Sequence, residues 1–560
     1  MAEQATATAQ KKGGFFEFVE RVGNKVPHPV LMFLYLIIGL MILSHILFLF
    51  GVSVTDEVIT PVPLQQLGNL RDALGGSVVP YNPYTSEVVE IPEFIVQEQT
   101  FAVRSLLTSE GLRHFFVSFL PNFSGFTVIG VTFLAMLGAG VAEQAGLMNA
   151  LIRKLVAATP AGLLTFMMVF VGVISSLASD AGYLILIPLA AAAFASVGRH
   201  PLVGLSAAFA GVAAIFTVNL APVAIDAMLT EITNEAIALV GGAPISLVAN
   251  LYFNIASSFI LAIVATIVAE RVIAPRLGTW DPAQGQADTA ATEQEIDREL
   301  EARGLRAALW GFLAVLGPVV VLTVIPGAPL RRPDGQVGGN LPLIDSLLFI
   351  ITLFFLVSGI AFGRVVGTIK SSADVIAKAS KTFAGLGGMV LMFLMISQFI
   401  AFFNYTNLPT VIAVNLAGIL KELDIGALPL LMLMTVVIVL LDFIMPGAVP
   451  KWAIFAPIFV PLFIRLGVAP QSVLAAYRIG DSPVNPITPL MVYLPFILTV
   501  AQRYQKDAGI GTLIALMIPY TVIIAVAWLI LLAIWFLINI PLGPGYLPQA
   551  ASLISLMGGL

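Results

Sequence analysis

The chain alternates long apolar runs with short polar breaks, a pattern typical of a protein that crosses a membrane many times. A bilayer core about 30 Å thick requires roughly 20 apolar residues for each helical span. The runs that meet this requirement are 30–50, 123–142, 181–198, 252–272, 308–326, 343–363, 385–403, 427–445 and 514–540. Further apolar runs are shorter or interrupted. The pattern predicts an all-α polytopic membrane protein.

The composition strengthens this prediction. Apolar residues make up 59% of the 560 and charged residues 11%, and the mean hydropathy is +0.99, whereas a soluble domain has about 25% charged residues. The chain has no cysteine, which excludes a disulfide framework and a thiolate metal site. The net charge of −5 indicates no particular partner. Because the chain has no basic cluster, we expect no nucleic-acid partner. Membrane lipid is the expected surrounding.

Charged residues between the apolar runs predict the orientation of the chain. The first 29 residues are basic, with Lys11, Lys12, Arg21 and Lys25. Because basic segments stay in the cytoplasm, we expect a cytoplasmic N-terminus. The apolar run that follows is too long for a signal peptide and lacks a cleavage site, so it is expected to remain as an anchor. Segment 51–122 is richer in acids and is expected on the opposite side.

The two halves of the chain contain related sequences. Moving residues 188–211 along the chain by 269 positions places them on 457–480. The identical pairs are Pro188/Pro457, Phe194/Phe463, Gly198/Gly467, Pro201/Pro470, Leu205/Leu474, Ala207/Ala476 and Gly211/Gly480. Several are proline and glycine, whose positions carry backbone meaning. Each unit has a polar break, an apolar arm, a Gly-x-x-Pro turn, a helix and a second break.

Two halves with interrupted apolar segments at corresponding places indicate a secondary transporter, with its site near the bilayer midplane where the halves meet. The chain divides accordingly into four regions. They are a cytoplasmic tail (1–29), a first transmembrane half with a hairpin and a broken helix (30–275), a cytoplasmic linker (276–306) and a second such half (307–560). An odd number of spans between the units makes the repeat inverted.

The second unit ends in "AAYRIGDSPVNPITPLMVYLPF", residues 475–496. Its prolines remove N–H donors and push the preceding residues away from helical geometry, so the helix should end near Asp481. Broken backbone at membrane depth is tolerated only where protein buries it or where it lines a watery cavity. Free carbonyl groups and carboxylates suit a hard cation such as sodium. The candidate cation ligands are Asp442, Asp481 and Asn485.

Arg478 and Asp481 are three residues apart and lie on one face of a helical turn. An ionisable residue at the membrane centre costs roughly 2.5–3.5 kcal/mol, so such residues are usually functional. The alternative is a structural ion pair at the helix end.

The remaining candidates each have a functional and a structural interpretation. Asp180 is either a transport residue or an N-cap. Lys451 and Trp452 are either membrane-interface anchors or substrate-binding residues, in which case the tryptophan ring would stack on an aromatic substrate. The 269-residue shift places Trp452 on Tyr183. Asn219 is either a site residue or a turn former.

Other function classes fit less well. An intramembrane aspartyl protease would pair Asp180 with Asp481, but the Gly-x-Gly-Asp motif is incomplete at 479–481 and no Tyr-Asp partner exists. The motifs His-Glu-x-x-His and Gly-x-Ser-x-Gly are absent. A channel would show a repeated filter or a ring of charges, and the sequence resembles neither. We therefore expect a transporter and not an enzyme.

The motifs "LASDAGYLILIPLAA", "KWAIFAPIFVPLF", "AAYRIGDSPVNPITPLM" and "GIGTLIALMIPYTVIIAVAW" resemble those of the AbgT family, the p-aminobenzoyl-glutamate transporters, over nearly the whole chain. The resemblance implies a bacterial inner-membrane homodimer. Each protomer would hold about nine spans and two re-entrant hairpins, with an inner transport domain against a dimerising scaffold. It implies transport of p-aminobenzoyl-glutamate, or export of sulfonamide antifolates, driven by a sodium or proton gradient without another cofactor.

The resemblance also implies site residues, which are Asp180, Trp452, Pro470, Arg478, Asp481 and Pro489. Three positions depart from the family pattern. Val449 replaces a serine, Pro483 stands in "DSPVN" where the family has "DSSTN", and Asp442 replaces an asparagine expected to bind sodium. The additional buried acid favours proton coupling.

The chemistry of the proposed substrate agrees with these residues. A guanidinium pairs with carboxylates in a bidentate manner, and p-aminobenzoyl-glutamate has two carboxylates and one aromatic ring. Arg478 and Trp452 would supply the complement. The alternative substrate is another small carboxylate, as in other members of the ion-transporter superfamily.

Overall fold

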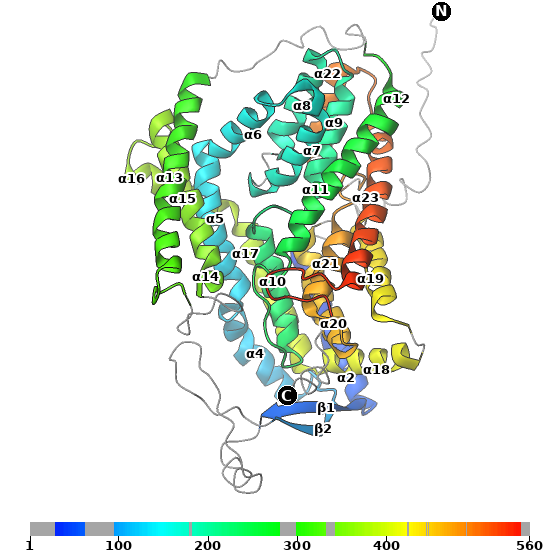
Figure 1. Ribbon diagram of the computed structural model, residues 1–560. Coiled ribbons are helices and arrows are strands. Elements are labelled where there is room, and N and C mark those ends of the chain that lie inside the picture. Colours follow the sequence, from blue (N-terminus) through cyan, green and yellow to red (C-terminus); the bar gives the residue numbers. More distant parts are fainter. Residues whose placement is uncertain are drawn as a thin grey trace, which may run out of the picture.

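The computed structural model describes residues 29–61, 94–178, 182–280, 298–331, 342–422, 425–443, 445, 447–488 and 490–549. Nearly all of the predicted cytoplasmic tail and most of the predicted linker therefore lie outside the described residues. The described chain is mainly helical (Figure 1). This agrees with the all-α membrane fold that the sequence predicts.

The helices of the first half follow one another as α2 (Pro29–Leu49), α4 (Ser109–Ser124), α5 (Thr127–Ala145), α6 (Leu147–Ala157), α7 (Leu164–Ile174), α8 (Ile187–Ser196), α9 (Pro201–Phe209), α10 (Ala224–Ala238), α11 (Leu251–Val268) and α12 (Ala274–Leu277). π-Helical turns extend three of them, namely η3 (Gly182–Leu186), η4 (Ala210–Ala214) and η5 (Ala269–Ile273). A 3₁₀ turn, η2 (Ser175–Ala178), follows α7.

The helices of the second half are α13 (Arg298–Val324), α14 (Pro342–Asp345), α15 (Leu347–Val366), α16 (Ser372–Gly385), α17 (Gly387–Tyr405), α18 (Leu408–Glu422), α19 (Ala427–Asp442), α20 (Ala448–Arg465), α21 (Pro470–Asp481), α22 (Leu494–Tyr504) and α23 (Ile510–Ile538). In the described part of the chain, 8 helices are long and apolar enough to cross a membrane, and α7 and α19 are shorter apolar helices. The apolar run 181–198 forms η3 and α8, one arm of a hairpin with α9.

Two strands, β1 (Ser53–Pro61) and β2 (Phe94–Ala102), form an antiparallel pair with Ser53 opposite Ala102. The pair lies at the lower end of the molecule in Figure 1, beyond the end of α2. It belongs to the acid-rich segment between the first two apolar runs and was not predicted from the sequence.

The predicted repeat forms two helical hairpins, α8–α9 and α20–α21, with matching backbone geometry. Their turns place Gly198 at φ +72° and Gly467 at φ +76°, a conformation that glycine adopts without steric cost. In each turn the N–H of the next residue donates to a carbonyl five residues earlier, from Arg199 to Phe194 and from Val468 to Phe463, both at 2.9 Å. Pro201 and Pro470 then begin α9 and α21. The 269-residue relation therefore holds in three dimensions.

Each hairpin packs against the helix that follows the other hairpin. Helix α10 packs on α20, whereas α22 packs on α8 and α9. Figure 1 shows α8 and α9 in the upper part of the molecule and α20 in the lower part. This crossed packing places the break that precedes α10 next to the break that precedes α22.

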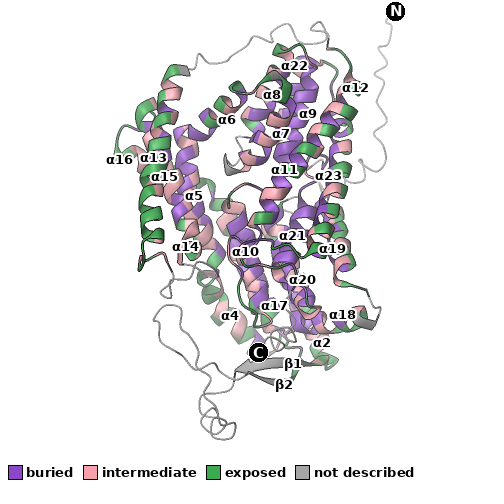
Figure 2. Cartoon of the chain, viewed as in Figure 1, coloured by how far each residue is buried: buried purple, intermediate pink, exposed green. Residues whose placement is uncertain are grey.

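Helices α5, α13, α15 and α16 form a separate group that lies at the left in Figure 1, and α15 packs on both α13 and α5. Figure 2 shows that α13 is mostly exposed, whereas α9, α10 and α21 are mostly buried. The exposed residues of α13 include Trp310, Val320 and Val324, which suits a helix that faces lipid.

The close approach of α21 to α19 generates a prediction about stability. A Cβ on Gly480 would lie 2.6 Å from the Cβ of Ile438 and 2.9 Å from the carbonyl oxygen of Thr435. Overpacking of this kind costs about 1–3 kcal/mol. We expect Gly480→Val to lower the melting temperature of the purified protein in detergent. Gly388→Ala on α17, where no atom lies within 4 Å of the added methyl group, is the control, and a Gly480→Val protein as stable as this control would contradict the prediction.

Candidate functional site

The second breaks of the two units meet inside the protein and hydrogen-bond to each other. They are residues 217–222, before α10, which we call the first break, and residues 482–488, before α22, which we call the second break. Thr217 lies between η4 and α10, and Ser482 follows α21. Their hydroxyl oxygens are 2.7 Å apart, and the backbone N–H of Thr217 donates to the Ser482 hydroxyl at 3.3 Å. Both residues are fully buried. Residues that are 265 positions apart in the sequence thus satisfy polar groups that lipid would leave without partners.

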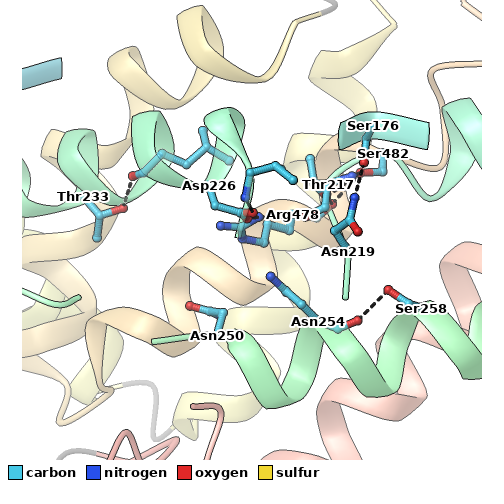
Figure 3. Close-up of polar contacts among 12 residues, drawn as sticks. Ser176, Thr217, Asn219, Asp226, Thr233, Asn250, Asn254, Ser258, Arg478 and Ser482 are labelled. Carbon is cyan, nitrogen blue, oxygen red and sulfur yellow. Dashed lines mark hydrogen bonds and ion pairs between the residues drawn. The ribbon is translucent and has the colours of Figure 1, made fainter. Parts of the chain in front are cut away.

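Arg478 on α21 joins this contact to helix α10. Its Nη1 donates to the carbonyl oxygen of Thr217 at 2.7 Å and forms an ion pair with Asp226 Oδ1 at 2.5 Å. Figure 3 shows Arg478 and Asp226 side by side, with Thr217 next to them. Asp226 also accepts a hydrogen bond from the backbone N–H of Val223 and so caps the start of α10. The arginine connects the two breaks.

Asp226 was not among the residues predicted from the sequence, and the alternative interpretation of an ion pair between Arg478 and Asp481 does not describe the structure. The two residues do belong to the same helix, but Arg478 pairs with Asp226 and Asp481 with Lys451. A signal for Asp226 was present in the sequence, because an acid at the third position of an apolar helix after a polar break fits a helix N-terminus.

A second buried ionic cluster contains Asp442, Lys451 and Asp481. The Nζ of Lys451 lies 2.9 Å from Asp481 Oδ1 and also pairs with Asp442 Oδ1. Lys451 and Asp442 have no exposed surface, and Asp481 has 1%. Lys451 is therefore not the membrane-interface anchor considered as an alternative. Tyr477 adds a hydroxyl that contacts Asp481 at 3.3 Å.

Two carboxylates and one ammonium in this cluster leave one formal negative charge. Asp442 Oδ2 is buried and has no hydrogen-bond partner in the described part of the chain. Oxygen ligands and a surplus negative charge are what a hard monovalent cation or a proton requires. The cluster therefore fits a coupling ion. Asn485, the third predicted ligand, instead directs its amide Nδ2 toward the carbonyl oxygen of Ala213 at 3.5 Å.

Trp452 is enclosed by protein. Its ring stacks on Tyr477, with centroids 4.3 Å apart, and its Nε1 donates to the Thr233 hydroxyl at 2.9 Å. No part of the side chain is exposed. A substrate ring could reach it only after α10 or α21 moved away. The predicted stacking of Trp452 on a substrate is therefore not available in this conformation.

The other predicted residues have mixed positions. Asn219 donates to the Ser176 hydroxyl at 2.7 Å, as Figure 3 shows, and accepts from the Leu220 N–H at 2.8 Å, so it shapes the first break. Pro470 begins α21 at the hairpin turn, away from the breaks. Asp180 and Pro489 lie outside the described residues.

A cavity of about 440 Å³ lies where the breaks face helices α5, α15 and α17. The residues that line it from the breaks and hairpins are Ser176, Tyr183, Phe216, Pro222, Val223, Ala224, Ile225, Met228, Gly447, Ala448, Val449, Asp481, Asn485, Leu490, Met491, Val492 and Tyr493. The facing helices contribute Ala135, Met136, Ala139, Glu143, Leu348, Ile351, Phe355 and Met389. Of the predicted site residues that the structure describes, Asp481 and Asn485 reach this cavity.

Known proteins are similar to this chain over nearly its whole length. The AbgT putative transporter family matches residues 14–549 of the chain. The p-aminobenzoyl-glutamate transport protein of Escherichia coli (strain K12) is 34% identical over 551 residues, which are 98% of this chain and 100% of that protein.

Two solved structures are also similar. The YdaH transporter of Alcanivorax borkumensis superposes with a TM-score of 0.80 at 34% identity, covering 92% of this chain and 100% of that chain. Neisseria gonorrhoeae MtrF, described with a class of antimetabolite efflux pumps, superposes with a TM-score of 0.81 at 35% identity, covering 95% of this chain and 100% of that chain.

The buried pair of Arg478 and Asp226 generates a prediction. Removing one partner leaves an uncompensated buried charge, which costs about 3–5 kcal/mol. We expect Arg478→Gln to lower the melting temperature and the monodisperse fraction in detergent. The double variant Arg478→Gln with Asp226→Asn removes both charges and should recover most of the loss. The measurement is thermal unfolding followed by size-exclusion chromatography. A single variant as stable as the double variant would show that the pair does not hold the breaks together.

Proposed function

Because the chain belongs to the AbgT putative transporter family, we propose that it is a secondary active transporter of p-aminobenzoyl-glutamate that uses a cation gradient. The family is one of transporters and not of enzymes, so the intramembrane aspartyl protease considered from the sequence is rejected. The name of the Escherichia coli relative supports the proposed substrate.

The observation that carries the proposal is the position of the cavity. It lies at the junction of both breaks and is bordered by a group of helices that belongs to neither hairpin. Secondary transporters with internal repeats bind substrates at such a junction, and one part then moves relative to the other. Because Asp481 belongs both to the cavity wall and to the ionic cluster, a ligand in the cavity and a coupling ion would influence each other.

The lining of the cavity suits a small aromatic carboxylate. Most lining residues are apolar, with Met136, Met228 and Phe355 among them. Helix α20 begins at the cavity wall, and no side chain caps its first turn. The positive end of its dipole favours a carboxylate there. Arg478 does not line the cavity, and we assign it a positioning role because it fixes the first break next to α21.

We propose that the coupling ion, sodium or a proton, binds beside Asp442 and Asp481. Lys451 lies between the two carboxylates, so an incoming sodium ion would have to share their oxygens with an ammonium group. A proton would need only one oxygen atom, and Asp442 Oδ2 is suitably placed. This comparison favours proton coupling.

The direction of transport and the assembly are further parts of the proposal. The likeness to MtrF supports export of sulfonamide antifolates as a second activity. Following the family resemblance, we propose a homodimer in the bacterial inner membrane with a cytoplasmic N-terminus. A different small carboxylate is the alternative substrate.

Counterflow in proteoliposomes tests this function. Vesicles loaded with unlabelled p-aminobenzoyl-glutamate should accumulate the labelled compound, and sodium and proton gradients applied separately should identify the coupling ion. The same assay with a labelled sulfonamide tests export. Absence of counterflow with both compounds, from protein that remains monodisperse, would refute the proposal.

Asp481 is the residue that we expect to join the cavity to the coupling ion. Asp481→Asn should reduce gradient-driven uptake by roughly tenfold or more, because a hydrogen bond to a charged group contributes about 1.5–3 kcal/mol. Asp374→Asn is the matched control, since Asp374 is the N3 residue of the capping box that begins the surface helix α16, and the amide oxygen of asparagine can accept the same backbone hydrogen bonds. Normal gradient dependence in Asp481→Asn would remove the residue from the coupling site.

A further inference from the structure

The cavity is bordered by a pair of stacked tyrosines from opposite halves of the chain. The ring centroids of Tyr183 and Tyr493 are 4.4 Å apart and their planes differ by 10°. Tyr183 belongs to the turn η3 that leads into the first hairpin, and Tyr493 precedes α22 after the second break. Both residues line the cavity.

We propose that these two residues, which we call the tyrosine platform, form the aromatic subsite on which the ring of the transported molecule stacks. The inference rests on the proposed function, and it assigns to Tyr493 and Tyr183 the role that sequence reasoning gave to Trp452. Tyr493 makes the contact with the ligand, and Tyr183 supports it from behind.

The internal repeat explains why the tyrosines, and not the tryptophan, take this role. Tyr183 and Trp452 occupy equivalent positions of the two units. In the second unit the ring of Trp452 stacks on Tyr477, hydrogen-bonds to Thr233 and has no exposed surface. In the first unit the equivalent ring reaches the cavity. The same position therefore serves packing in one half and the cavity wall in the other.

The exposure of the two rings assigns their separate roles. Tyr183 is 5% exposed, whereas Tyr493 is of intermediate exposure and is followed by a buried residue, Leu494, that anchors α22. Of the two rings, Tyr493 is therefore the more accessible from the cavity. An offset-stacked third ring is a favourable arrangement for aromatic groups.

The platform also explains how a ligand would affect the conformation. Its two members come from different halves of the chain. The position of the first hairpin therefore affects, through Tyr183, how well a ligand ring stacks on Tyr493. A ligand shifts a conformational equilibrium only when it binds one state better than the other. Separation of the tyrosines would provide such a difference in affinity.

The test measures binding of p-aminobenzoyl-glutamate by calorimetry in detergent and its counterflow in proteoliposomes. Tyr493→Phe keeps the ring and should bind within about twofold of the unsubstituted protein, whereas Tyr493→Leu should weaken binding roughly 3- to 10-fold. Tyr183→Leu should weaken binding in the same direction. Tyr252→Leu is the matched control, because Tyr252 is an exposed tyrosine on α11 that does not line the cavity.

A second measurement does not depend on the stability of the leucine variants. Replacement of Tyr493 by the photoreactive residue p-benzoyl-phenylalanine should crosslink labelled p-aminobenzoyl-glutamate, and excess unlabelled compound should prevent the crosslink. The same replacement at Tyr252 should give none. Equal affinity in the phenylalanine and leucine variants, or no crosslink from position 493 in protein that still performs counterflow, would overturn the platform. Absence of counterflow with the unsubstituted protein would instead overturn the proposed function.

Discussion

The structure depends on how two interrupted helices satisfy their polar groups inside a membrane. Lipid supplies no hydrogen bonds, so unwound backbone and buried charges need partners within the protein. Here each break supplies partners for the other, through the hydroxyls of Thr217 and Ser482 and the guanidinium of Arg478. Asp226 balances the arginine. The crossed packing of the two hairpins follows from this requirement, because it is what brings the breaks together.

The two repeat units use one backbone plan for different purposes. Their hairpin turns have the same glycine conformation and the same hydrogen bonds, yet the turns are held by different neighbours. Arg199 beside the first turn pairs with Glu270 of η5 at 2.7 Å. Val468 in the second turn pairs with Gln549 of the C-terminal segment. An ion pair and a backbone contact respond differently to ionic strength, so the contacts at the two turns depend differently on the salt concentration.

The residues of the site were predictable to different degrees. Proline spacing placed the end of α21 at Asp481, and the break after it, because proline acts through its own ring and missing N–H. The burial of Asp442 and Lys451 followed from their apolar surroundings only in part, since the lysine was also compatible with a membrane interface. Asp226 was missed because its partner, Arg478, is about 250 residues away, and local sequence does not identify partners at such a separation.

The sequence by itself determined the membrane class, the helical hairpins and the positions of the breaks, because apolar length, glycine and proline act over a few residues. Only the tertiary structure decided which charges pair and which rings reach the cavity. Tyr183 and Trp452 illustrate the difference, since equivalent sequence positions have different surroundings. Which side chains are exposed and which pair with each other depends on the distant helices that pack opposite them. In this protein the crossed packing of the two halves determines those neighbours.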